Sequence, residues 1–166
     1  MATIWIIGMM GAGKTTVAPL VAARLEYEWV DTDRLVESRT GMSVVGLFGL
    51  GESSFRSEEA AAVRSMAGRQ AVVACGGGIV LDDALVETMR GSGFVVWLDA
   101  PVEILLARTI ADAERPLLSA DPEGALQRIL EERRWRYEAA AHATVSAGSS
   151  PDRVAEEVIE AWSRSS

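Results

Sequence analysis

The feature that most constrains the fold of this chain is a glycine-rich stretch at residues 8–15. It reads G-M-M-G-A-G-K-T and matches the phosphate-binding loop pattern G-x-x-x-x-G-K-T. Residues 3–7 before it form a short apolar run typical of a buried strand, and apolar residues at helical spacing follow it as far as Leu25. A strand, a glycine loop and a helix N-terminus together present N–H donors at the positive end of a helix dipole. The sequence therefore predicts a site for the phosphates of a nucleotide.

Lys14 is the only lysine in the chain, and all other basic residues are arginines. A compact ammonium fits between the β- and γ-phosphate oxygens, whereas a planar guanidinium does not. The hydroxyl of Thr15 would then be available to a Mg²⁺ ion on the same phosphates. The alternative is a glycine-rich turn with an exposed lysine, which the flanking strand and helix disfavour.

The bulk composition limits what the chain can do. Its 166 residues, 49% hydrophobic and 24% charged, suit one globular domain spanning residues 1–166. The net charge of −8 argues against a nucleic-acid partner and requires any anion site to be assembled locally from cations in a cleft. We expect no membrane association, because no apolar run reaches about 18 residues. A single cysteine, Cys75, and the absence of a leader before Thr3 predict a cytoplasmic protein.

Short apolar runs alternate with helical patterns along the rest of the chain. Further strands are predicted at residues 29–31, 71–74, 94–98 and 144–146. Strands alternating with helices predict an α/β fold of three layers, in which a parallel sheet is covered on both faces. One stretch interrupts the alternation with three successive helices, expected at residues 34–39, 44–48 (ended by Gly49 and Gly51) and 52–66. Ligands of such sheets bind at the carboxyl ends of the strands.

Two of the predicted strand ends carry residues suited to phosphoryl transfer. Asp31 and Asp33 follow the second strand; one could hold Mg²⁺ through water and the other accept a proton from an attacking hydroxyl. Alternatively, Asp33 is only a helix cap. Glycines 76–78 follow the third strand, where they would let a ligand approach the backbone and offer N–H donors, or simply form a flexible turn.

Arginines supply the other candidate residues. Arg56 and Glu59 share a helix face, either as a surface ion pair or as an anion-binding arginine with its orienting carboxylate. Arg108 and Arg115 flank an irregular segment that is either a lid bringing a cation to the phosphoryl group or an exposed loop. A later helix carries a group of arginines, of which at most one or two can face a cleft: Arg133, Arg134 and Arg136. His142 is interpreted as a surface or capping residue, and Cys75 as a small core residue.

Taken together, these motifs resemble those of shikimate kinase, a family in the nucleoside-monophosphate-kinase-like P-loop group. The resemblance extends from Gly8 to the final helix. Its motifs are G-x-x-G-x-G-K-T at Gly8, D-T-D at Asp31, F-R-x-x-E at Phe55, G-G-G at Gly76, R-P-L-L at Arg115 and R-x-x-x-Y from Arg133 to Tyr137. It implies a five-stranded parallel sheet in the order 2-3-1-4-5, a substrate-binding subdomain at residues 33–61 and a lid at residues 109–121.

The resemblance also implies a reaction and its participants. The γ-phosphoryl of MgATP would pass to the 3-hydroxyl of shikimate, giving shikimate 3-phosphate and ADP, a step of aromatic amino acid biosynthesis. ATP is then a co-substrate, and one Mg²⁺ is expected per monomer. We expect a cytoplasmic monomer that binds no nucleic acid.

Roles follow by position in the matched motifs. The implied catalytic residues are Lys14, Asp33 as base, and Arg115 from the lid. Shikimate would contact Asp33, Arg56, Gly77 and Arg133, with the two arginines on its carboxylate. ATP would contact Gly11, Ala12, Gly13, Lys14, Thr15, Thr16, Arg108 and Arg115. Thr15 would bind the metal directly and Asp31 through water.

The chain departs from the family pattern at one place. Many members carry a basic residue against the adenine in the loop before the last helix, but residues 147–150 contain no cation and Arg153 comes later, inside the helix. The adenine contacts are therefore left open. Two other functions also stay open: a P-loop kinase for another small polyol acid or cyclitol, and a non-catalytic nucleotide-binding switch.

Overall fold

The computed structural model describes residues 3–111 and 120–165, and within these residues five parallel strands form one sheet. The strand order is β2-β3-β1-β4-β5, which confirms the predicted order. The strands are β1 (Thr3–Ile7), β2 (Glu28–Asp31), β3 (Ala71–Ala74), β4 (Gly93–Asp99) and β5 (Ala143–Ser146). Each lies within one residue of its predicted position. The inner strands β1, β3 and β4 are buried along nearly their whole length, as their continuous apolar runs predict, whereas the edge strands β2 and β5 are only partly buried.

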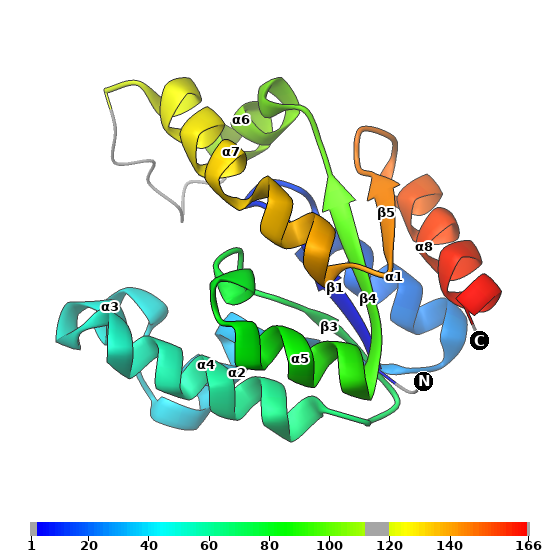
Figure 1. Cartoon of the computed structure of the whole chain (residues 1–166), viewed down its shortest axis with the longest axis horizontal. Helices are drawn as coiled ribbons and strands as arrows, with labels where there is room; N and C mark the ends of the chain where they lie inside the picture. The colour runs from blue at the N-terminus through cyan, green and yellow to red at the C-terminus, as the bar shows by residue number, and fades with distance from the viewer. Residues whose placement is uncertain (1–2, 112–119, 166) are drawn as a thin grey trace.

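Helices cover both faces of this sheet (Figure 1). Helices α1 and α8 pack together on one face, and α5 and α7 lie on the other. The helices in chain order are α1 (Lys14–Leu25), α2 (Thr32–Thr40), α3 (Val44–Leu50), α4 (Glu52–Met66), α5 (Asp83–Ser92), α6 (Val102–Ala111), α7 (Pro122–Ala140) and α8 (Pro151–Ser165). This is the predicted three-layer α/β/α arrangement. Among residues 3–111 and 120–165, no helix is both long enough and apolar enough to cross a membrane.

Helices α2, α3 and α4 follow one another without a strand, as predicted, and reach out to one side of the sheet (Figure 1). They enclose a small core of their own, formed by Val36, Leu47, Phe55 and Ala62. Gly41 ends α2 in a left-handed conformation, with φ 69°. This insertion sits beside the carboxyl end of β2, and thereby adds a second wall to any site at that edge of the sheet.

Two predictions about this insertion were wrong. Helix α3 continues to Leu50, so Gly49 lies inside it, and only Gly51 ends it; an exposed helical glycine costs only about 1 kcal/mol relative to alanine. Helix α2 begins at Thr32, two residues before its predicted start at Arg34. Its N-cap is Asp31, whose side chain accepts hydrogen bonds from the backbone. The alternative role of Asp33 as a helix cap is therefore excluded.

The segment predicted as a lid lies only partly within the described residues. Helix α6 runs to Ala111, past its predicted end at Arg108, so the first residues of the predicted irregular segment are helical. Arg115 and the rest of the R-P-L-L motif lie outside the described residues. Helix α7 begins as predicted, with Asp121 accepting a hydrogen bond from the N–H of Gly124 and Pro122 in the first turn.

Candidate active site

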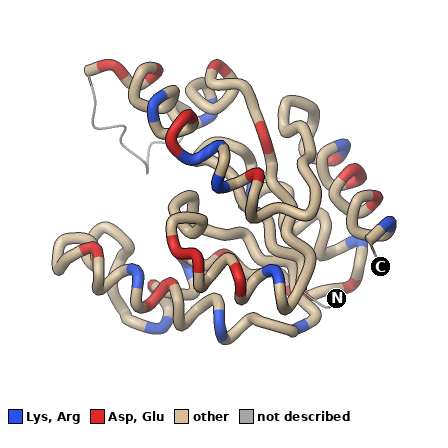
Figure 2. The backbone as a smooth tube through the Cα atoms, viewed as in Figure 1, with Lys and Arg blue, Asp and Glu red and all other residues tan. Residues whose placement is uncertain are grey.

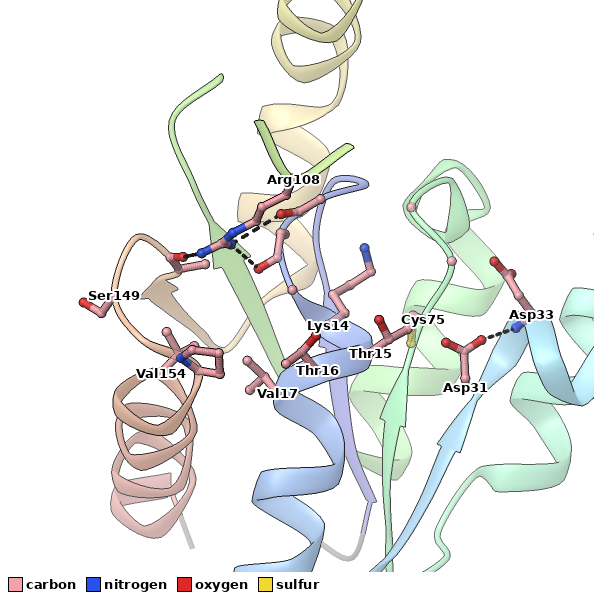
Figure 3. Close-up of a pocket in the computed structure, with 17 residues that line it drawn as sticks. Lys14, Thr15, Thr16, Val17, Asp31, Asp33, Cys75, Arg108, Ser149 and Val154 are labelled. Atoms are coloured by element: carbon pink, nitrogen blue, oxygen red, sulfur yellow. Dashed lines mark hydrogen bonds between the residues drawn. The ribbon is translucent and has the colours of Figure 1, made fainter. Parts of the chain in front are cut away.

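A cavity of about 410 Å³ opens at the carboxyl ends of the strands (Figure 3). One wall is the phosphate loop with the start of α1, and the opposite wall is the end of β2 with the glycines after β3. The predicted site residues that line it are Gly11, Ala12, Gly13, Lys14, Thr15, Thr16, Asp31, Asp33, Gly77 and Arg108. Residues of motifs that are far apart in the sequence thus come together at one edge of the sheet.

The phosphate loop has a shape that only glycine permits at two of its positions. Gly8 and Gly11 have φ values of 148° and 79°. A Cβ atom at Gly8 would lie 2.7 Å from the carbonyl oxygen of Leu98, and one at Gly11 would lie 2.7 Å from that of Leu105. The loop is therefore seated directly on β4 and α6, and its glycines provide this close fit as well as a cradle of N–H groups.

Lys14 extends back along its own loop. Its Nζ donates hydrogen bonds to the carbonyl oxygens of Gly8 (2.7 Å) and Met9 (2.8 Å), and the residue is only 7% exposed. The ammonium is thus held at the loop, where phosphate oxygens would be recognised. Next to it, Thr15 and Thr16 are exposed and line the cavity.

Asp31 and Asp33 occupy different environments despite their spacing. Asp31 Oδ1 accepts hydrogen bonds from the N–H groups of Asp33 (2.9 Å) and Arg34 (3.2 Å), which fixes its carboxylate at the start of α2 (Figure 3). Asp33 follows in the first turn, and its Oδ1 would lie 3.1 Å from a Cβ atom at Gly76. Asp31 is therefore anchored as a cap, while the carboxylate of Asp33 faces the glycine loop.

Arg56 and Glu59 form an ion pair in the interior, and the surface-pair alternative is wrong. Arg56 Nη1 lies 2.7 Å from Glu59 Oε2, and Glu59 is 1% exposed. Burial raises the pKa of Glu59 above its ordinary value, and the neighbouring guanidinium opposes this shift. The guanidinium also lies over the rings of Phe55 (5.3 Å) and Phe48 (5.9 Å). Arg56 is thereby held as a preformed cation.

The glycines after β3 pack directly against these charged groups. A Cβ atom at Gly78 would lie 2.6 Å from Arg56 Nη2, and one at Gly76 would lie 3.0 Å from Glu59 Oε1. The N–H of Gly76 donates to Thr32 Oγ1 (3.0 Å), and Thr32 is fully buried. The carbonyl of Gly77 accepts from residues of α7. Side chains on both sides therefore hold this loop. Sequence reasoning missed the contact of Thr32, although its place at the centre of the D-T-D motif could have drawn attention to it.

Arg133, Arg134 and Arg136, which lie close together in α7, have different environments. Arg133 Nη1 donates to the carbonyl oxygen of Gly77 (3.2 Å). Arg134 pairs with Asp99 (3.3 Å), and Arg136 pairs with Asp83 (3.0 Å). Of these three, only Arg133 contacts the glycine loop, in agreement with the expectation that at most one or two would face the cleft. Basic and acidic positions are interspersed along α7, as Figure 2 shows, so this helix carries charges of both signs.

Arg108 joins the phosphate loop to the loop after β5. It donates to the carbonyl oxygens of Gly11 (3.4 Å), Ala12 (3.3 Å) and Ala147 (2.9 Å), as Figure 3 shows. Arg153 instead pairs with Glu157 (3.1 Å) along the exposed surface of its own helix, so it does not replace the missing basic residue of that loop. This end of the cavity is lined by Val17, Ala147, Ser149, Pro151 and Val154.

The two remaining candidates lie outside the charged cluster. Cys75 is buried, and burial raises the pKa of its thiol, so the thiol stays protonated and packs as a core residue, as predicted. His142 is exposed, and its Nδ1 accepts a hydrogen bond from the N–H of Val95 (3.0 Å). Neither side chain supplies a nucleophile or a base to the cavity.

Comparisons with known proteins agree with this geometry. Residues 10–163 match the family model described as shikimate kinase. A shikimate kinase of Halorhodospira halophila is 42% identical over 162 residues, covering 95% of this chain and 92% of the relative. One from Symbiobacterium thermophilum is 46% identical over 147 residues, covering 86% and 84%. The structure of the Acinetobacter baumannii shikimate kinase in complex with shikimate superposes with a TM-score of 0.91 at 34% identity, covering 96% of this chain and 92% of that one.

Proposed function

The chain belongs to the shikimate kinase family, and from this premise we propose how its cavity divides between the two substrates. Its activity is the transfer of the γ-phosphoryl of ATP to the 3-hydroxyl of shikimate, which gives shikimate 3-phosphate and ADP and serves aromatic amino acid biosynthesis. ATP occupies the side of the phosphate loop and α1. Shikimate occupies the side formed by α2, α4 and the glycines after β3, with residues 33–61 as its binding subdomain.

The observation that carries this division is the convergence of one carboxylate and two arginines on the glycine loop. Asp33 faces Gly76, Arg56 packs against Gly78, and Arg133 bonds to the carbonyl of Gly77. A small carboxylate with hydroxyls needs cations for its anionic group and an acceptor for one hydroxyl proton. Arg56 and Arg133 bind the carboxylate of shikimate, the backbone at Gly77 contacts its ring substituents, and Asp33 accepts the proton.

On the opposite wall, the phosphate loop binds the triphosphate. The N–H groups of residues 11–16 surround the phosphates, and the ammonium of Lys14 exchanges its carbonyl partners for phosphate oxygens. Arg108 lies where the base end of the nucleotide would be, between the phosphate loop and Ala147. Arg115, from the proposed lid at residues 109–121, supplies a further cation to the transferring group.

The residues at the mouth of this wall fit a magnesium ion. Magnesium is usually held by one or two carboxylates together with substrate phosphates, rather than by a cage of protein ligands. Within residues 3–111 and 120–165, no group of three or more His, Cys, Asp or Glu side chains is arranged to hold a metal ion by itself, but Thr15 and Asp31 both line the cavity. Thr15 would bind the ion directly and Asp31 through water. The ion would neutralise charge on the phosphates during transfer.

With both substrates and the ion bound, the side chains of this chain would supply positioning, stabilisation of charge and one proton acceptor. Asp33 takes the proton of the 3-hydroxyl of shikimate while the oxygen of that hydroxyl forms a bond to the γ-phosphorus. The bond between the γ-phosphorus and the oxygen that bridges to the β-phosphate breaks, and ADP leaves. Lys14 and Arg115 balance the charge that develops on the transferred group. The site is complete within one chain in this assignment, so we propose a monomer as the active form.

The test is release of ADP with and without shikimate. We expect ADP release that depends on shikimate, that stops when EDTA removes Mg²⁺, and that does not occur when gluconate or a cyclitol replaces shikimate. A polyol-acid kinase would instead release ADP with one of those other acceptors. A nucleotide-binding switch would bind ATP but release negligible ADP with every acceptor, and either result would overturn the assignment.

A further inference from the structure

The carbonyl group of Gly77 is held by two donors from α7. Tyr137 Oη donates a hydrogen bond to it at 2.6 Å, and Arg133 Nη1 donates one at 3.2 Å. Together they use the two acceptor positions of that oxygen. Tyr137 is fully buried, and burial raises the pKa of its phenol, so the hydroxyl stays protonated and acts as a donor.

We propose that Tyr137 is a positioning residue for shikimate, acting through the carbonyl of Gly77. This inference rests on the proposed shikimate site, because Tyr137 does not itself line the cavity and its contact is with the backbone of the glycine loop. It adds a role to the last position of the R-x-x-x-Y motif, in which only the arginine had been assigned one.

The first consequence concerns the orientation of the peptide between Gly77 and Gly78. No cis peptide bond occurs in the described residues, so the carbonyl of Gly77 and the N–H of Gly78 point in opposite directions. Holding the carbonyl toward α7 therefore turns the N–H of Gly78 away from α7. Gly78 packs against the guanidinium of Arg56 on its other side. The hydroxyl of Tyr137 thus fixes both a backbone donor and the surface on which Arg56 rests.

The second consequence concerns Arg133. The Tyr137 hydroxyl lies closer to the Gly77 oxygen than the guanidinium does, so it is the principal donor to that oxygen. Without it, Arg133 would be the only one of these two side chains left to hold the carbonyl of Gly77, and binding the substrate carboxylate would compete with that task. With it, the remaining N–H groups of the guanidinium fork are available for a carboxylate.

The surroundings of Tyr137 keep its hydroxyl in place. Its ring stacks on Trp97 with centroids 5.7 Å apart and an interplanar angle of 14°. One turn beyond it, Arg90 Nη1 donates to the final carbonyl groups of α7, those of Ala139, Ala140 and Ala141. Because both the ring and the end of its helix are fixed, loss of the hydroxyl would release the loop rather than the tyrosine.

The test compares Tyr137→Phe with Tyr27→Phe, the same change at the other tyrosine of the chain. Tyr27 packs edge-on against Trp162, with ring centroids 6.0 Å apart, and is not among the residues that line the cavity. We expect Tyr137→Phe to raise both the KM and the Kd for shikimate about five- to tenfold, the effect of one buried hydrogen bond, while the KM for ATP stays within about twofold. Tyr27→Phe should leave all three constants unchanged.

The selectivity of the change decides the matter even if the variant is less stable. A general loosening of the protein would raise the constants for ATP and shikimate together, and this outcome would overturn the inference. Equal shikimate constants for Tyr137→Phe and Tyr27→Phe would overturn it as well. Failure of the proposed function looks different, because the unmodified protein would then show no ADP release that depends on shikimate.

Discussion

The phosphate loop and the proposed shikimate site meet at one cavity, which Asp33 and Gly77 line from the shikimate side, but they hold their shapes by different means. The loop at residues 8–15 is contiguous, and its form follows from glycine backbone angles and from Lys14 bonding to its own loop. The shikimate site is assembled from β2–α2, α4, the glycines after β3, and α7. Its groups are fixed by contacts between distant residues, such as Arg133 with Gly77. The first depends on local geometry, and the second on the packing of several elements.

This difference predicts how the two substrates respond to substitution. A change in the shikimate site should alter shikimate binding or turnover while leaving the phosphate loop, and thus the affinity for ATP, intact. A change in the phosphate loop should instead affect both ATP binding and turnover, because the transferred phosphoryl group is held there. Substitutions in the shikimate site therefore give the clearest tests, and each has a matched residue elsewhere in the chain.

The largest effect is expected for Asp33→Asn. An amide cannot accept the proton of the 3-hydroxyl, so kcat should fall by about 10²- to 10⁴-fold. The fold should persist, because the cap of α2 is Asp31 and not Asp33. Steady-state kinetics measure kcat, and a thermal melt checks that the variant is folded. Asp83→Asn, in the first turn of α5, is the matched control and should keep normal turnover. Near-normal turnover of Asp33→Asn would remove this residue as the base.

The second effect is on substrate affinity and is expected for Arg133→Ala. Loss of one charge-assisted clamp on the shikimate carboxylate should cost about 2–4 kcal/mol, or at least about 30-fold in the KM for shikimate. The KM for ATP should rise far less. Arg134→Ala is the control, since Arg134 pairs with Asp99 and does not contact the glycine loop. If Arg133→Ala leaves the shikimate KM unchanged, the carboxylate clamp is wrongly assigned.

The same difference explains what could be predicted from the sequence. The strands and the phosphate loop were predictable because contiguous residues determine them. The roles of Arg56 and Arg133 came from family resemblance, since spacing alone left a surface ion pair and three equivalent arginines open. The contacts of Thr32 and Tyr137 with the glycine loop were missed because 44 and 60 positions separate the partners. Only the folded chain brings such pairs together.

A third prediction concerns the close packing of Gly78. Its backbone has φ −93° and ψ 2°, which alanine also adopts, so Gly78→Ala should fold. Its Cβ atom would lie 2.6 Å from Arg56 Nη2, and the guanidinium must therefore move. We expect a rise of about tenfold in the shikimate KM, as for loss of one good hydrogen-bonded contact, with little change for ATP.

Gly91→Ala is the control for this substitution. Gly91 lies in α5, and a Cβ atom there would meet nothing within 4 Å. Its kinetics should be unchanged, and its stability should rise by up to about 1 kcal/mol from helix propensity. Should Gly78→Ala bind shikimate as well as Gly91→Ala does, the packing of Arg56 on the glycine loop would not matter for binding.

The smallest effect is a pH dependence confined to the shikimate site. Burial raises the pKa of Glu59 from its ordinary value of 4.5, so this carboxylate gains a proton at a higher pH than an exposed glutamate would. Protonation removes the charge that holds Arg56 at 2.7 Å. The KM for shikimate should therefore rise as pH falls through the raised pKa. The KM for ATP should not follow it.

Protonation of Glu59 should have the opposite effect on the stability of the fold: it weakens shikimate binding but increases the free energy of unfolding. Because the folded state binds this proton more tightly than the unfolded state, the stability contributed by Glu59 is present at acid pH and is lost as pH rises through the folded-state pKa. The acid-side rise in KM is thus a loss of positioning and not unfolding caused by Glu59. Comparing pH profiles for Glu59→Gln with those for its half-buried neighbour, Glu58→Gln, isolates the contribution of Glu59, because every other carboxylate of the site is the same in both variants. We expect Glu59→Gln to have a raised shikimate KM at all pH values and to lack the rise of about three- to fivefold that Glu58→Gln retains, the scale of one weakened charge-assisted bond. If the two variants give the same profile, the ionisation of Glu59 does not control Arg56, and the position of that arginine depends instead on its other contacts, with Glu52 (3.5 Å), Phe48 and Phe55.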